Sequence, residues 1–148
     1  MKKFLFLCAF SMLLSTALFA QSSEKVSEII KTEKTTFGQA AYLVGVYSGS
    51  VEESSDYDKA VSALKEKGVI SADVDSNKEI NLAELSYLCM QTTEMNGGLF
   101  YTLFPGPRYA FRELKARGIL PALADPGVKV NGRDAIAVLN GCIEEDGE

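Results

Sequence analysis

The stretch that decides the fold is "YDKAVSALKEKGVISADVDSNKEINLAELSYL", residues 57–88. It matches "PRYAFRELKARGILPALADPGVKVNGRDAIAV", residues 107–138, without a gap, at an offset of 50 positions. An internal period of this length is typical of repeated helical units, each of which buries its apolar face against its neighbours. The identical pairs are Ala60/Ala110, Leu64/Leu114, Lys65/Lys115, Gly68/Gly118, Ala72/Ala122, Asp75/Asp125 and Asn81/Asn131.

Each matched stretch predicts a helix, a loop and a second helix. In the first helix Ala60, Val61 and Leu64 share one face, which the 3.6-residue period directs toward the core. Gly68 stands where a left-handed glycine ends a helix, and the apolar pair after it predicts a short plug into the core. We therefore predict an all-α fold, a small compact helical domain of tandem helix-loop-helix repeats.

The start of the second helix carries a capping signal, and the signal occurs three times. Each copy places a capping side chain three residues before an acid or amide, as in a capping box. The helix predicted after the first copy has no matching helix before it, so we expect a lone helix at 35–50. Unit 1 then covers 56–95 and unit 2 covers 107–143. The three pairs are Thr36 with Gln39, Asn81 with Glu84, and Asn131 with Asp134.

The N-terminus indicates export. Residues 1–20 combine two lysines, an apolar run and a small-residue end, which is the layout of a secretory signal peptide. Residues 21–34 are polar and predict a tether or a frayed helix before a single domain at 35–148. No later stretch supplies the roughly 20 consecutive apolar residues of a transmembrane helix. We expect the protein in the periplasm or at the cell surface.

Composition excludes several function classes. The net charge is −5 at pH 7, and loss of Lys2 and Lys3 with the signal makes it more negative, which disfavours nucleic acid as a partner. The chain has no histidine, so catalytic triads and histidine-ligated zinc sites in their common forms are absent. Cys89 and Cys142 remain after processing, either as buried free thiols or as one bridge. We predict a protein that is not an enzyme and has no organic cofactor.

An aromatic linker at 96–107 separates the two units. Its sequence, "NGGLFYTLFPGP", mixes large apolar residues with turn-forming ones. Such a linker usually lies across a core, and if it is exposed it is a candidate binding surface. We select Tyr101 and Phe104 as candidate contacts, with Arg108 and Arg112 one helical turn apart as a candidate anionic site.

The loop "DVDSNKEINLAE" is open to two interpretations. It is locally similar to an EF-hand loop, which takes calcium ligands from positions 1, 3, 5, 7, 9 and 12. Position 6 is Lys78 rather than glycine, and the equivalent residues of unit 2 cannot form a calcium cage. The alternative is a loop that leads into a capped helix. The candidate ligands are Asp73, Asp75, Asn77, Glu79 through its carbonyl, Asn81 and Glu84.

The order of these features resembles the S-layer homology (SLH) domain, a repeat of exported bacterial proteins. "YDKAVSALKEKGVIS" with "INLAELSYL", and "YAFRELKARGILP" with "VNGRDAIAVL", are similar to its units, and "TTFGQAAYLVGVYSG" to the last helix of an earlier unit. The resemblance implies attachment to the cell envelope, by binding cell-wall polymer or peptidoglycan in grooves between repeats. The arginine of the family's Thr-Arg-Ala-Glu-like motif is replaced here by Phe37, Leu82 and Gly132.

These observations lead to one principal prediction and one alternative. The principal prediction is a non-enzymatic envelope or protein-interaction module whose partner is cell-wall glycan or another envelope protein. The alternative is a calcium-binding module built on residues 73–84. Both are hypotheses about function that the residue pattern motivates.

Overall fold

The computed structural model describes residues 23–70 and 73–146. Within these ranges the chain forms helices joined by loops and no strand, which confirms the predicted all-α class. The expected signal peptide at 1–20 lies outside the described residues. A first helix covers residues 23–31. The others are α2 (Phe37–Tyr47), α3 (Tyr57–Glu66), α4 (Leu82–Thr92), α5 (Leu99–Leu103), α6 (Pro107–Ala116) and α7 (Gly132–Asp146).

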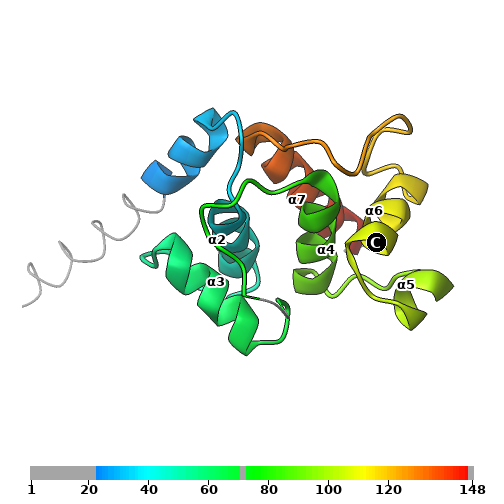
Figure 1. The fold of residues 1–148 in the computed structure, drawn as a ribbon, viewed down its shortest axis with the longest axis horizontal. Coiled ribbons are helices and arrows are strands. Elements are labelled where there is room, and N and C mark those ends of the chain that lie inside the picture. The colour runs from blue at the N-terminus through cyan, green and yellow to red at the C-terminus, as the bar shows by residue number, and fades with distance from the viewer. Residues whose placement is uncertain (1–22, 71–72, 147–148) are drawn as a thin grey trace, which may run out of the picture.

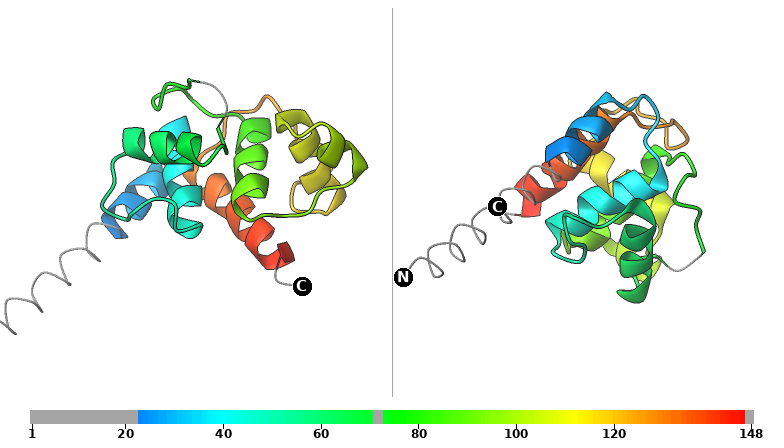
Figure 2. Two further views of the ribbon diagram at one scale, coloured as in Figure 1. Left: turned by 90° about the horizontal axis from the view of Figure 1, so that it is seen from below. Right: turned by 90° about the vertical axis from the view of Figure 1, so that its left-hand side faces the viewer.

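Helix α4 lies in the middle of the molecule. In Figure 1 the pair α2 and α3 lies on one side of α4, α5 and α6 lie on the other, and α7 passes behind. The packing agrees, because α4 contacts α6, α2 and α7, whereas α5 packs on α6. The left view of Figure 2 shows α5 at the outer edge of the molecule. The aromatic linker that contains α5 therefore lies beside the helical core and not across it.

The predicted helix starts are confirmed. Thr36 and Asn81 each accept a hydrogen bond from the amide three residues on, and Gln39 and Glu84 bond back to the cap amide, which completes two capping boxes. In the third copy the Asn131 side chain accepts from the Asp134 amide at 2.9 Å. These bonds satisfy amide groups that a helix start leaves without an intrahelical partner.

Four helices end in the same way. In each, the backbone amide of the second residue after the C-cap donates a hydrogen bond to the carbonyl five residues earlier, as in the Schellman motif. These bonds run from Ser50 to Gly45, Val69 to Leu64, Met95 to Met90 and Ile119 to Leu114, at 2.8 to 3.2 Å. The residue before each donor has a positive φ, and three of these residues are glycines: Gly49 (65°), Gly68 (76°) and Gly118 (77°). The fourth is Glu94, with φ 54°.

The two stretches matched at an offset of 50 adopt the same local structure. Helices α3 and α6 are each 10 residues long and begin 50 positions apart. After them, Asp75 and Asp125 each accept a bond from the amide two residues on, at 2.9 and 2.7 Å. The loops then pair with neighbouring helix starts, through bonds from Phe37 to the Lys78 carbonyl and from Leu82 to the Val128 carbonyl. These features support the tandem repeat, which stays an interpretation.

Of the two forms expected for the polar segment, a tether or a frayed helix, residues 23–31 adopt the helical one. They form a helix in which Ile29 is fully buried. The chain that follows is held by a bond from the Gly132 amide to the Thr32 carbonyl at 2.9 Å. Gly132 permits this close approach, because a Cβ there would lie 1.6 Å from the Ile29 carbonyl oxygen. Ile29 and the room that Gly132 leaves for its backbone therefore help to dock this segment, with a further bond from Lys25 to the Ser55 carbonyl.

Both cysteines lie in the core as free thiols, one on α4 and one on α7. A hydrogen bond with Cys142, together with burial, raises the pKa of the Cys89 thiol. The core around them consists of apolar side chains from every long helix. Its largest fully buried members include Tyr42, Ile29, Leu64, Ile80, Leu85, Leu88, Met90 and Leu114.

Candidate functional site

Helix α5 exposes an apolar surface that we call the ledge, made of Leu99, Phe100, Leu103 and Phe104. These four side chains are between 59% and 70% exposed. All come from one short helix and the residue after it, so they form one patch. Exposed apolar patches of this kind mark interaction sites in soluble proteins. The structure thus favours the second of the two outcomes expected for the linker, exposure as a binding surface.

Aromatic rings at the ledge are organised by Tyr109 of α6. The Phe100 and Tyr109 rings stack with centroids 6.2 Å apart and planes 10° from parallel, and the Phe104 ring lies 6.3 Å from Tyr109. Beside them is a cleft of about 180 Å³ between α5 and α6, lined in part by Phe100, Tyr109 and Arg112. Stacked rings fix one another's orientation, so the ledge presents a defined shape.

Of the four predicted contact residues, Tyr101 lies buried rather than on the surface. It is 7% exposed, and its hydroxyl accepts a hydrogen bond from the Gln91 side chain at 2.7 Å. Burial raises the pKa of Tyr101, and the bond from Gln91 acts in the opposite direction. Tyr101 therefore anchors α5 to α4 and supports the ledge from below. Phe104 is exposed on the ledge as the prediction requires.

The two predicted arginines lie one turn apart on α6, and one of them reaches the cleft beside the ledge. Arg108 and Arg112 lie on exposed positions of α6, and Arg112 also lines the cleft. Neither forms an ion pair with any residue that the structure describes, whereas Arg117 pairs with Glu113 at 3.1 Å. Arg112 therefore brings to the cleft a positive charge that forms no ion pair with the described residues, in a chain whose net charge is −5. Glu113, which lines the same cleft, is already paired with Arg117.

The side chains predicted as calcium ligands are engaged separately. Asp73 pairs with Lys65, which lowers the pKa of that carboxyl group. Asp75 accepts from the Asn77 amide, and Glu84 completes its capping box and pairs with Lys78 at 2.6 Å. Among the described residues no group of three or more acidic or thiol side chains is arranged to hold a metal ion. These contacts explain each of these side chains as part of a loop or a helix cap, and calcium binding stays a prediction.

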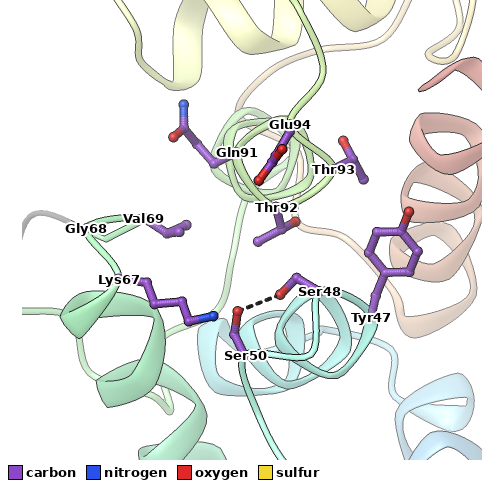
Figure 3. Close-up of a pocket in the computed structure, with 10 residues that line it drawn as sticks. All are labelled: Tyr47, Ser48, Ser50, Lys67, Gly68, Val69, Gln91, Thr92, Thr93 and Glu94. Carbon is purple, nitrogen blue, oxygen red and sulfur yellow. Dashed lines mark hydrogen bonds between the residues drawn. The ribbon is translucent and has the colours of Figure 1, made fainter.

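A second pocket lies where α2, α3 and α4 end (Figure 3). Its volume is about 530 Å³, and we call it the polar pocket. Sequence reasoning missed it, because its residues come from three helix ends that are distant in the chain. Its lining consists of Tyr47, Ser48, Ser50, Lys67, Gly68, Val69, Gln91, Thr92, Thr93 and Glu94.

Glu94 is unusual within the polar pocket. It holds the left-handed position at the end of α4 that glycine holds at the ends of α2, α3 and α6. A residue with a Cβ adopts this conformation at a cost of roughly 1–2 kcal/mol. Strain of this kind is concentrated at functional positions. One signal in the sequence was available, since Glu94 matches Gly49 when the helix starts at Thr36 and Asn81 are aligned.

Three comparisons with known proteins add no relative. No protein-family model, curated protein or solved structure matches the chain. In the part of the chain that the structure describes, no helix has the length and apolar character needed to cross a membrane.

Proposed function

We propose that the protein is a non-enzymatic interaction module of the cell envelope, which docks an acidic amphipathic segment of another envelope protein on the ledge. The observation that carries this proposal is the exposure of four large apolar side chains on α5. Their exposure opposes the tendency of such side chains to be buried, and a docked partner would bury them.

Charge identifies the kind of partner. Arg112 lines the cleft beside the ledge, and Arg108 lies exposed one turn earlier on α6. Neither forms an ion pair with another described residue, so a partner segment with carboxylates on its polar face could pair with both. A second copy of this chain fits less well. A two-fold dimer through the ledge would bring the arginines of both copies together, and like charges at an interface are unfavourable.

The size of the ledge indicates a transient complex. Complete burial of one large apolar side chain contributes about 1.5–3 kcal/mol, and the ledge side chains already bury about a third of their surface. Four of them contribute roughly 4–8 kcal/mol, from which the cost of association must be subtracted. The cleft beside Phe100 supplies an anchor, because its 180 Å³ would accept one large apolar side chain of the partner.

Fluorescence anisotropy with two designed helical peptides tests the docking. Both carry leucine and phenylalanine on one face, and the other face is glutamate in one peptide and lysine in the second. We expect the acidic peptide to bind more tightly, and the double variant Phe100→Ser/Phe104→Ser to abolish its binding. Leu123→Ser is the matched control, because Leu123 is 98% exposed but lies away from the ledge.

Two results would count against the proposal. Equal binding of both peptides would show that the arginines do not select an acidic partner. Binding that survives Phe100→Ser/Phe104→Ser would show that the ledge is not the docking surface. Sedimentation of the protein alone provides the second check. A dimer that Phe100→Ser/Phe104→Ser converts to a monomer would identify a second copy as the occupant.

The envelope location rests on the first 20 residues and on the resemblance to S-layer homology units. Expression of the full chain in a bacterial host, followed by fractionation and N-terminal sequencing, tests it. We expect a periplasmic or surface-bound chain that begins at Gln21. An uncleaved chain in the cytoplasm would refute export while leaving the docking experiment unaffected.

A further inference from the structure

The polar pocket lies apart from the ledge. We propose that it binds an amino saccharide, a sugar that carries a free ammonium group beside its hydroxyls. The site lies at the ends of α2, α3 and α4, whereas the ledge lies on α5 (Figures 1 and 3). Its volume of about 530 Å³ lies within the range of small-molecule sites.

The two threonine hydroxyls of the polar pocket already donate hydrogen bonds to backbone carbonyls. Thr92 donates to the Leu88 carbonyl at 2.8 Å, and Thr93 donates to the Cys89 carbonyl at 2.9 Å. Both threonines are nearly buried, so these bonds are well shielded. A hydroxyl that donates inward still offers lone pairs as acceptors. The two threonines can therefore contact a ligand only as hydrogen-bond acceptors, so the ligand must supply the donors.

Serines at the end of α2 follow the same rule. Ser48 donates to the Gly45 carbonyl at 3.2 Å and is 2.8 Å from the Ser50 hydroxyl, as the dashed line in Figure 3 shows. With its proton on Gly45, Ser48 accepts from Ser50, and the lone pairs of Ser50 remain available. Gln91 likewise uses its NH₂ group on Tyr101, which leaves its amide oxygen as an acceptor.

Electrostatics add a preference for positive charge. The pocket gathers the C-terminal ends of three helices, each of which carries a partial negative charge. Glu94 adds a carboxylate that forms no ion pair with any other described residue. Glu94 is one of the residues that line the pocket, and its backbone is in the left-handed region. An ammonium group placed at Glu94, on the side of the pocket away from Ser50 and Lys67, would satisfy both features.

A saccharide fits the pocket better than a lysine side chain of a peptide. Tyr47 is 45% exposed and offers an aromatic face on which a sugar ring can stack. Lys67 extends toward Ser50 in Figure 3 and would donate to a sugar hydroxyl, an acceptor that a lysine side chain lacks. Val69 is the single aliphatic side chain of the lining, so the stem of a lysine would find little apolar surface.

Isothermal titration calorimetry with two disaccharides tests the proposal. The probes are β-linked glucosamine disaccharide, measured below neutral pH where its amines are charged, and its N,N′-diacetylated form. We expect the free-amine probe to bind about ten-fold more tightly, which is the effect of one charge-assisted hydrogen bond. Glu94→Gln should remove this preference, because it keeps the size of the side chain and deletes the charge. Tyr47→Ala should weaken both probes.

Glu66→Gln is the matched control, since Glu66 is an exposed residue of α3 outside the pocket lining. It should keep the ten-fold preference. The proposal is overturned if the two disaccharides bind equally, if the preference survives Glu94→Gln, or if Glu66→Gln removes it as well. Tighter binding of a short lysine peptide than of the glucosamine disaccharide would assign the pocket to peptides instead.

Discussion

Replacement of Glu94 by glycine should make the protein more stable. Glu94 has φ 54°, in the left-handed region that a Cβ makes unfavourable by roughly 1–2 kcal/mol. Glycine removes this strain but gains freedom in the unfolded chain, which offsets about 0.4–1 kcal/mol. The side chain forms no ion pair within the described residues, so no further loss is expected. The net gain in the free energy of unfolding is about 0.5–1 kcal/mol.

Urea denaturation measures this gain. With a denaturant slope of about 1–3 kcal/mol per molar, the midpoint should rise by about 0.5 M. Glu94→Ala is the control, because alanine keeps the Cβ and should give no such rise. The reciprocal change, Gly49→Glu at the end of α2, should lower the midpoint by a similar amount. A Cβ at Gly49 meets no atom within 4 Å, so its cost is backbone strain alone.

The reasoning fails if Glu94→Gly lowers the midpoint or if Glu94→Ala raises it equally. The same variant links stability to function. Glu94→Gly deletes the carboxylate at the polar pocket, so it should weaken binding of the glucosamine disaccharide while it stabilises the fold. A gain in stability together with a loss of binding is the expected pattern when a residue is kept for function at the expense of stability.

Three further predictions concern packing, capping and thiol reactivity. Gly132→Ala places a Cβ 1.6 Å from a backbone oxygen of the N-terminal helix, so it should lower the free energy of unfolding in urea by about 2–4 kcal/mol. In the control Gly106→Ala the new Cβ meets no atom within 4 Å, so the free energy of unfolding should change little. Asn81→Ala removes the cap of α4 and should lower the free energy of unfolding by about 1 kcal/mol; an unchanged midpoint would contradict the capping role. Cys89 and Cys142 should react with an alkylating reagent in urea but not in the native protein, and equal labelling rates would show that they are accessible.

Much of the fold could be predicted because its signals are local. The capping pairs at Thr36 and Asn81 and the glycines at 68 and 118 act through the backbone within a few residues. Their effect on structure therefore depends little on the rest of the chain. The structure places each helix start and end where these residues indicated. The buried faces of α3 and α6 followed from the helical period for the same reason.

Features that depend on distant residues could not be predicted in this way. Ile29 docks the first helix because Gly132 leaves room for its backbone. The residues next to Ile29 and next to Gly132 in the sequence give no sign of this contact. Helix α5 has five residues, too few for a period to show which side faces the core. In the structure Tyr101 is the buried aromatic residue of the linker, where it accepts a hydrogen bond from Gln91. Phe104 is exposed.

Gln91 connects the two proposed surfaces. Its amide NH₂ group donates to Tyr101, which supports the ledge from below, and its side chain also lines the polar pocket. A ligand donor at the Gln91 amide oxygen would polarise the same amide and strengthen its bond to Tyr101, because hydrogen bonds in a chain reinforce one another. A saccharide in the polar pocket would therefore hold α5 more firmly against α4. The geometry thus provides a physical route by which occupancy of one surface stabilises the other.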